Sequence, residues 1–274
     1  MPGDQKPVVN YRDLVNGIRQ LGVTGRPAIA HVSLSAFGMV RGGADTLLGA
    51  LLSGVSGLMM PAFTYTTMLI PEDGPDANAS DYGSGRDTNR MAEFFKENLP
   101  ADSLMGVVAE ALRRRPDALR SMHPILSFAG VQVEEALKAQ TYADPLAPIR
   151  VLARQGASVI LMGVDHTVNT SIHYAERLSG RRQFIRWALT PDGVRECPGF
   201  PGCSDGFQAV ESLLAGLTRT VSIGGAQVSA FALVDLIDEV QQLLKRDPLA
   251  LLCDRLECPR CDAVRADVRR AGMS

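Results

Sequence analysis

Short apolar runs alternate with amphipathic stretches in the first part of the chain. Residues 11–22 place Leu14, Ile18 and Leu21 at i, i+4 and i+7, which predicts an amphipathic helix. The apolar string PAIAHVSL then predicts a strand, residues 44–52 predict a helix, and SGLMMPAF predicts a second buried strand. A strand, a helix and a strand at this spacing indicate a βαβ-like unit, in which helices cover a sheet.

The pattern continues through the rest of the chain. Asp102 or Ser103 can cap a helix that runs to Arg115. ILSFAGV and SVILMGV predict buried strands, and RRQFIRWALTPDGVREC predicts a hairpin that turns at residues 191–193. Four further helices are predicted by EEALKAQ, PLAPIRVLARQG, DGFQAVESLLAGL and ALVDLIDEVQQLLKR. We therefore expect an α/β fold with a central mixed β-sheet flanked by helices, in a single domain over residues 1–274.

Residues 65–90 have no such period. Gly, Pro, Asp, Asn and Ser dominate the segment, and about 25 structureless residues inside a compact domain are typical of a functional loop or a disordered segment. Its acidic residues are Glu72, Asp73, Asp76, Asp81 and Asp87. Two interpretations stay open: a mobile surface loop with no role, or an acidic lip that attracts a polycationic ligand.

Charge and composition narrow the class of protein. The 28 basic and 30 acidic side chains are interspersed and give a net charge of −2, without the basic stripe that nucleic-acid binding requires. The N-terminal residues have no apolar core of signal-peptide length, and no apolar run approaches the roughly 20 residues of a membrane span. We expect a soluble cytoplasmic enzyme, as a monomer or a homodimer, with no membrane or nucleic-acid partner.

All five cysteines come after residue 196, and their spacing has two interpretations. Cys253, Cys258 and Cys261 form C-x4-C-x2-C, and Cys197 and Cys203 precede them by some fifty residues. Four thiolates in two pairs are typical of structural zinc. Because these spacings are loose, we expect reduced packing cysteines and no required metal. The alternative is a zinc-dependent protein whose C-terminal half binds a partner.

The most informative stretch is GVDHTVNTSIHYAE at residues 163–176. Asp165 and His166 fall at the turn after the SVILM strand, and His173 and Glu176 share one face if a helix follows. An imidazole paired with a carboxylate near the end of a strand can act as a general base. The alternative is a His and a Glu on a solvated helix face.

The other two histidines also lie in unusual strings. These are HVSLSAFG at residues 31–38 and RSMHPILSFAG at 120–130. In this order with NTSIHYAE, and with MPAFT, LPADSLMGVVAEALRRRPDALRSMHP and GCSDGF, the chain resembles the aminoglycoside 3-N-acetyltransferase family from about residue 10 to about residue 265. The resemblance implies the α/β fold of that family, with acetyl-CoA as cosubstrate. It also implies an aminoglycoside amine as acceptor and antibiotic resistance as the consequence. Acetylation of a different amine, such as a biosynthetic intermediate, stays open.

Three catalytic residues follow from the resemblance. It implies that His173 is the general base, and Glu176 is the natural carboxylate to orient its ring, although Asp165 remains a candidate for that role. His31 lies in a string that the family places at the coenzyme and reaction centre, and the alternative is a buried histidine satisfied by its neighbours.

Candidate coenzyme-binding residues come from the same strings and from one helix start. Arg41 with its two following glycines opens a predicted helix, and helix N-termini bind phosphates through free N–H groups. His123 precedes Pro124, and we expect it to shape the wall of the site rather than transfer protons. The complete set of candidate coenzyme-binding residues is Ser33, Ser35, Gly38, Arg41, Thr64, Arg120 and Ser121.

Recognition of the acceptor is where the chain departs from the family. Many members carry an Asp in a PxFDP-like string, whereas EFFKENLPAD here places Lys96 or Glu97 near that position. Asp87, Glu93 or Glu97 could substitute for the missing carboxylate. The substrate-binding candidates are Glu93, Asp165, His166 and Asn169.

Overall fold

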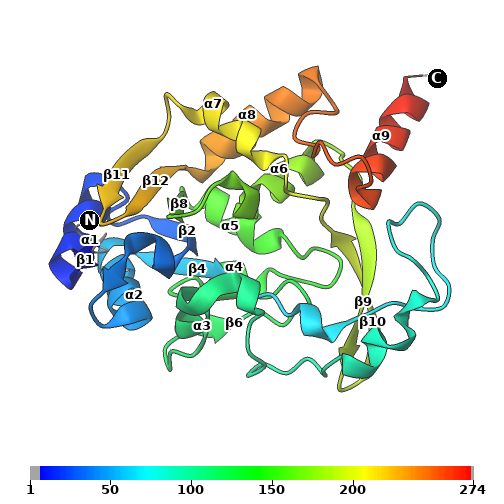
Figure 1. Cartoon of the computed structure of the whole chain (residues 1–274), viewed down its shortest axis with the longest axis horizontal. Helices are drawn as coiled ribbons and strands as arrows, with labels where there is room; N and C mark the ends of the chain where they lie inside the picture. Colours follow the sequence, from blue (N-terminus) through cyan, green and yellow to red (C-terminus); the bar gives the residue numbers. More distant parts are fainter. Residues whose placement is uncertain (1–6, 273–274) are drawn as a thin grey trace, which may run out of the picture.

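A mixed seven-stranded sheet runs through the centre of the molecule, whose computed structural model describes residues 7–272 (Figure 1). The strand order is β11-β12-β8-β2-β4-β7-β6, and β2 lies parallel to both β4 and β8, whereas the other pairings are antiparallel. The strands are β2 (Pro27–Val32), β4 (Gly57–Pro61), β6 (Leu119–Arg120), β7 (Phe128–Val131), β8 (Ser158–Met162), β11 (Arg219–Ile223) and β12 (Ala226–Ala232). The predicted mixed sheet is confirmed.

Helices pack on both faces of this sheet and form two apolar cores. The β2 strand serves both, because Ala28 and Ala30 belong to one core and the intervening Ile29 to the other. The first core is covered by α1 (Tyr11–Gln20), α2 (Gly43–Gly54) and α3 (Gly106–Arg113). The second is covered by α4 (Glu134–Lys138), α5 (Ala147–Arg154), α6 (Ser171–Leu178) and α8 (Leu233–Arg246).

The predicted N-terminal helix and βαβ unit are confirmed. Leu14, Ile18 and Leu21 are all buried, and Asn10 caps α1 in a reciprocal capping box with Asp13. The chain then forms β2, α2 and β4, and the two strands pair in parallel as expected for a βαβ unit. Both strands are buried along nearly their whole length, which explains why their apolar residues do not alternate with polar ones.

A second, three-stranded sheet contains the predicted hairpin. The hairpin consists of β9 (Phe184–Thr190) and β10 (Gly193–Phe200), and β5 (Met68–Leu69) adds to the free edge of β9. Residues 65–90 therefore differ from the prediction of a segment without regular elements, although residues 70–83 contain no helix or strand. The segment, drawn in cyan in Figure 1, contains β5 and two short 3-10 helices, η2 (Tyr65–Thr67) and η3 (Ser84–Arg86), and a third, η4 (Thr88–Met91), runs past its end.

Two asparagines explain how this Gly- and Pro-rich segment is ordered. The Asn78 side chain accepts a hydrogen bond from Ile185 N at 2.8 Å and donates to Ile185 O at 3.0 Å. Asn89 makes the same pair of bonds to Ile70 at 2.9 and 2.8 Å. Each amide thus takes the place of a strand partner for one residue, and this interaction leaves no periodic signal in the sequence.

Several elements were not predicted from the sequence. The hairpin of β11 and β12 was missed although apolar and polar residues alternate on both sides of its Gly224-Gly225 turn, and the arginine-rich helix α9 (Pro259–Ala271) lacks a clear apolar face. The helix expected over residues 205–217 is limited to η7 (Phe207–Val210) and the single turn α7 (Glu211–Leu214). The remaining short elements are β1 (Val8–Val9), η1 (Leu34–Phe37), β3 (Met39–Val40), η5 (Ser103–Met105) and η6 (His166–Val168). No helix within residues 7–272 is long and apolar enough to cross a bilayer.

Candidate active site

A pocket of about 350 Å³ opens at the carboxyl ends of the central parallel strands. His31 near the end of β2, Met60 near the end of β4 and Val164 just after β8 all line it. Ligands of open α/β sheets commonly bind outside the carboxyl ends of the strands, and small-molecule sites usually measure about 300–1,000 Å³. Its position and size therefore make this pocket the candidate active site.

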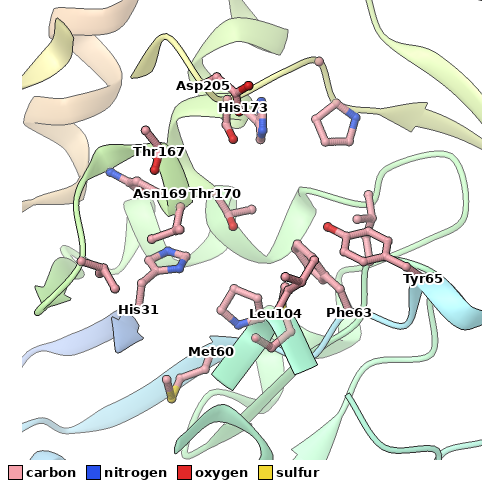
Figure 2. A pocket seen from close by; sticks show the side chains of 18 of the residues that line it. His31, Met60, Phe63, Tyr65, Leu104, Thr167, Asn169, Thr170, His173 and Asp205 are labelled. Carbon is pink, nitrogen blue, oxygen red and sulfur yellow. The ribbon is translucent and has the colours of Figure 1, made fainter. Parts of the chain in front are cut away.

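The opposite side of the pocket carries most of its polar groups. Figure 2 shows Thr167, Asn169, Thr170 and His173 along η6 and the start of α6, with Asp205 beside His173. Apolar side chains close the rest, including Phe63 and Leu104 together with the ring of Tyr65. An apolar pocket with a few convergent polar groups is the usual form of a site that binds and orients a small substrate.

His173, on this polar side, is the first of three buried side chains that are joined by hydrogen bonds, the His173–Glu176–Arg181 chain. His173 Nδ1 lies 2.8 Å from Glu176 Oε2, and Arg181 Nη1 donates to Glu176 Oε1 at 2.7 Å. The side chains of the three residues are 10%, 2% and 5% exposed. The hydrogen bond that the i, i+3 spacing permits is thus present, and the interpretation as a solvated helix face is wrong for this pair.

The hydrogen bond to Glu176 decides which nitrogen of the His173 ring carries a proton. Because the Glu176 carboxylate accepts hydrogen bonds, Nδ1 is the ring nitrogen that carries the proton, and Nε2 keeps its lone pair. The ring also packs edge-on against Phe207, with centroids 4.7 Å apart. Asp165 is not the orienting carboxylate, because it caps η6 through Thr167 N at 2.9 Å.

Arg181 completes the His173–Glu176–Arg181 chain, and the sequence analysis did not identify it. Besides Glu176, its guanidinium donates to the carbonyl oxygens of Pro248 and Ala250 at 2.6 and 2.8 Å. It lies beyond the end of α6, five residues after Glu176, so no helical spacing connects the two. These bonds fix the guanidinium, which in turn holds the Glu176 carboxylate in place.

His31 provides a second imidazole, of different character. Burial lowers the pKa of His31 from 6.5 to about 4, and the charge of the nearby His166 contributes to a smaller extent. The ring is therefore neutral at pH 7 and can donate one N–H. Its Nε2 is buried and has no hydrogen-bond partner within residues 7–272, and the ring lies in the pocket (Figure 2).

The buried histidines predict a pH-dependent stability. Burial also lowers the pKa of His123 to about 4, so His31 and His123 both stay neutral when folded at pH 5, whereas the unfolded chain protonates them. The unfolded state then binds more protons, and stability falls as the pH drops from 6.5 towards 4. We expect the free energy of unfolding to decrease by roughly 2 kcal/mol per histidine between pH 7 and pH 5.

Urea unfolding at the two pH values measures this effect. His123→Asn, which keeps a hydrogen-bond acceptor, should remove the share of the pH dependence that His123 contributes. Equal unfolding free energies of the unsubstituted protein at pH 7 and pH 5 would contradict the conclusion that His31 and His123 stay neutral in the folded protein at pH 5.

The predicted coenzyme residues of the β2–α2 connection lie outside the pocket. Ser33 and Ser35 are within 3.2 Å of one another through their hydroxyls, but neither lines the pocket, and Arg41 is exposed. Gly38 has a φ of +92°, and a Cβ there would lie 2.5 Å from Pro7 O, so its conformation explains the glycine. Coenzyme binding by these four residues stays a prediction.

The other predicted coenzyme residues have structural partners. Thr64 donates to Pro124 O at 2.7 Å, and Ser121 Oγ accepts from Phe128 N at 2.8 Å. Arg120 was expected to pair with the coenzyme or an acid, but its partners are Ser127 Oγ and the carbonyls of Ala62, Glu97 and Leu99. None of the three lines the pocket.

His123 has the structural role expected for it. Its Nδ1 accepts hydrogen bonds from Ile125 N at 3.1 Å and Leu126 N at 2.9 Å. It thereby holds the turn before β7, and Leu126 of this turn lines the pocket.

Of the predicted substrate-binding residues, only Asn169 lines the pocket. Asp165 and Glu93 are exposed, and the His166 ring stacks on Phe231 with centroids 5.5 Å apart. The one carboxylate that lines the pocket, within the described part of the chain, is Asp205. It lies in the GCSDGF string that contributes to the family resemblance, although its role did not follow from the sequence.

Comparison with known proteins identifies the family of the chain. A family model described as aminoglycoside 3-N-acetyltransferase matches residues 29–245. The chain belongs to this family. Aminoglycoside N(3)-acetyltransferase VII of Streptomyces paromomycinus is 29% identical to this chain, and the match covers 85% of this chain and 90% of the relative. The family membership predicted from the motifs is confirmed, and it makes the protein an acyltransferase.

Solved structures show the same fold. The apoenzyme of aminoglycoside acetyltransferase AAC(3)-IVa superposes with a TM-score of 0.76 at 23% identity, over 96% of this chain and 99% of that one. A structure titled AAC-IIIb binary with CoASH superposes with a TM-score of 0.69 at 21% identity, over 87% and 97% of the two chains. The predicted fold of the family is therefore confirmed.

Proposed function

We propose that the protein transfers the acetyl group of acetyl-CoA to an amino group of an aminoglycoside. The observation that carries this proposal is the His173–Glu176–Arg181 chain, whose imidazole lines the pocket at the carboxyl edge of the sheet. Acetyl transfer to an amine needs a base, because an alkylamine is mostly protonated at neutral pH and cannot attack a thioester. The relative from Streptomyces paromomycinus is named for such a reaction.

His173 serves as the base in this proposal. Nε2 accepts a proton from the neutral amine as the amine nitrogen forms a bond to the thioester carbon. The carbon–sulfur bond then breaks, and the imidazolium returns the proton to the departing thiolate, so that free coenzyme A leaves and the base is restored. The Glu176 carboxylate stabilises the imidazolium that forms, as the carboxylate of a serine-hydrolase triad does. Arg181 keeps that carboxylate oriented and paired, because a buried charge without a partner is costly.

His31 is the group best placed to stabilise the negative charge on the thioester oxygen. Its neutral ring can donate an N–H, and a preorganised donor in a site that excludes water is worth more than one in solvent. Ser33 was the hydroxyl expected for this role, but it lies outside the pocket, so the assignment moves to His31. Resistance to the antibiotic is the implied consequence, because acetylation removes a positive charge.

Asp205 is the proposed contact for a cationic group of the acceptor. Its carboxylate lines the pocket and forms an ion pair with Arg255 at 2.6 Å, and both side chains are at least half exposed. An ammonium group of the substrate can therefore approach the same carboxylate from the pocket side. This contact would take the place of the family Asp that is missing from the EFFKENLPAD segment.

The acidic segment is expected to act at longer range. Glu72, Asp73, Asp76, Asp81 and Asp87 are exposed and none lines the pocket, although Tyr65 at the start of the segment does. Replacing the five with Gln or Asn should raise KM for a polycationic amine several-fold at low salt and much less at high salt, because salt screens exposed charges. Steady-state kinetics at two ionic strengths measure the effect. An unchanged KM at low salt would reject the acidic lip.

A panel of aminoglycosides, including the atypical apramycin, tests the proposed function. Release of free thiol from acetyl-CoA should depend on the aminoglycoside, and each accepted drug should gain one acetyl group. Turnover confined to other small amines would favour the biosynthetic alternative.

The five free cysteines fit the reducing conditions of a cytoplasm, where such an enzyme would meet acetyl-CoA.

A further inference from the structure

Four cysteine thiols converge from two distant parts of the chain. Cys203 follows β10, whereas Cys253, Cys258 and Cys261 lie before and at the start of α9. All four side chains are buried, and their sulfur atoms lie within 4.8 Å of one another. The Sγ atoms of Cys253 and Cys261 lie 3.5 Å apart, and all four residues are free thiols. We call these four residues the thiol cluster.

The geometry of the thiol cluster matches a tetrahedral metal site. A zinc–sulfur bond of about 2.3 Å places two sulfurs of a tetrahedron about 3.8 Å apart. In the cluster, one pair of sulfur atoms lies 3.5 Å apart and all four lie within 4.8 Å of one another without a disulfide, so a small movement would bring them to the separation that one ion imposes.

Ordinary apolar packing does not account for the cluster. The four cysteines form an apolar group of their own, in which only Leu252 joins them. The fifth cysteine, Cys197, packs instead in the large core with aromatic and aliphatic neighbours. A cysteine used as a small apolar side chain would be expected in such a core, so the isolation of the other four indicates a shared ligand.

We propose that Cys203, Cys253, Cys258 and Cys261 bind one Zn²⁺ as four thiolate ligands. Soft sulfur ligands in a tetrahedral set favour zinc, and four protein ligands leave no open position, so the site is structural rather than catalytic. This inference replaces the sequence-based expectation of reduced packing cysteines. The spacing was misleading because Cys203 pairs across the fold with the C-terminal residues and not with Cys197.

Arginine side chains surround the site in a way that suits its charge. Four thiolates and one Zn²⁺ carry a net charge of −2. Arg255 Nη2 donates to Cys203 Sγ at 3.5 Å, and Arg265 donates to Cys253 O at 2.6 Å. Hydrogen bonds of this kind from surrounding residues orient and stabilise metal ligands.

The zinc site would fix one wall of the substrate pocket. It joins the segment of Cys203 to the start of α9, and two further contacts span the same junction. Arg260 Nη1 donates to Gly202 O at 2.9 Å, and Arg255 pairs with Asp205 at 2.6 Å. Gly202, Asp205 and Arg260 all line the pocket, so loss of the metal should loosen this wall without removing the catalytic histidine.

Metal analysis of the purified protein tests the proposal without any activity assay. We expect one zinc per chain by elemental analysis, and one zinc lost in Cys258→Ser. Cys197→Ser, which removes a buried cysteine outside the thiol cluster, should retain one zinc. Zinc content of the unsubstituted protein no higher than that of Cys258→Ser would overturn the proposal.

Two measurements on the unsubstituted protein keep the proposal testable if the variant fails to fold. Cobalt exchanged for zinc should give the intense visible bands of a tetrahedral tetrathiolate complex. Thiol titration in denaturant with a chelator should detect all five cysteines. Because each disulfide removes two thiols, detection of only three thiols or one would indicate disulfides in place of the metal and would overturn the zinc proposal. Because neither readout involves acetyl transfer, failure here leaves the proposed function intact.

Discussion

Replacing His173 with alanine is expected to lower kcat by about 10²- to 10⁴-fold, the usual contribution of a general base. The imidazole is the group in the pocket whose Nδ1 is held by a buried carboxylate, which leaves Nε2 for the incoming amine. Acetyl-CoA binding should remain largely intact, because the substitution removes a proton acceptor and not a phosphate contact. Steady-state thiol release and a binding measurement with acetyl-CoA give the two quantities.

A matched substitution separates the lost base from a disturbed fold. His123→Asn changes another buried histidine but keeps an acceptor for the amides of Ile125 and Leu126, so kcat should stay within a few-fold of the unsubstituted enzyme. Circular dichroism should show both variants folded. Turnover of His173→Ala close to that of the unsubstituted enzyme would reject the assigned base.

Glu176→Gln is expected to cost a similar factor by a different route. Arg181 can only donate hydrogen bonds, so the glutamine must offer it the carbonyl oxygen and point its NH₂ group at His173. Nδ1 then accepts a hydrogen bond, the ring proton moves to Nε2, and the imidazole can no longer take a proton from the amine. The equivalent carboxylate-to-amide change in a serine-protease triad lowers kcat by about 10⁴.

The effect of Glu176→Gln should appear in kcat with little change in KM for either substrate. Removing a charge from a buried ion pair also destabilises the fold, so activity must be measured below the unfolding transition. Glu135→Gln removes the same charge from the exposed surface of α4 and serves as the control. A kcat for Glu176→Gln equal to that of the control would mean that the carboxylate does not govern the ring.

The sequence predicted the parts of the fold whose pattern reflects burial. The strands PAIAHV and SVILM are apolar along their length because both faces of the sheet are covered, and α1 and α8 carry the periodic apolar face of surface helices. Two of the missed features, residues 65–90 and α9, depend on other interactions. Residues 65–90 are ordered by the side chains of Asn78 and Asn89, and α9 is so rich in arginine that no apolar face is evident.

The candidate site was predicted where its members are close in sequence. His173 and Glu176 are three residues apart on one helix, and the motif strings directed attention to His31 and Asn169. Arg181 and Asp205 were missed because only the folded chain brings Arg181 to Glu176 and Asp205 to the pocket. The thiol cluster shows the same limit, since Cys203 reaches its partners across about fifty residues.

A crystal structure of the enzyme with coenzyme A and an accepted aminoglycoside would show whether Nε2 of His173 removes the proton from the attacking amine. We expect one amine nitrogen within about 2.6–3.2 Å of Nε2, next to the coenzyme sulfur, and Glu176 still bonded to Nδ1. A complex in which the amine nearest that sulfur contacts another base, with His173 turned away from it, would rule out His173 as the base.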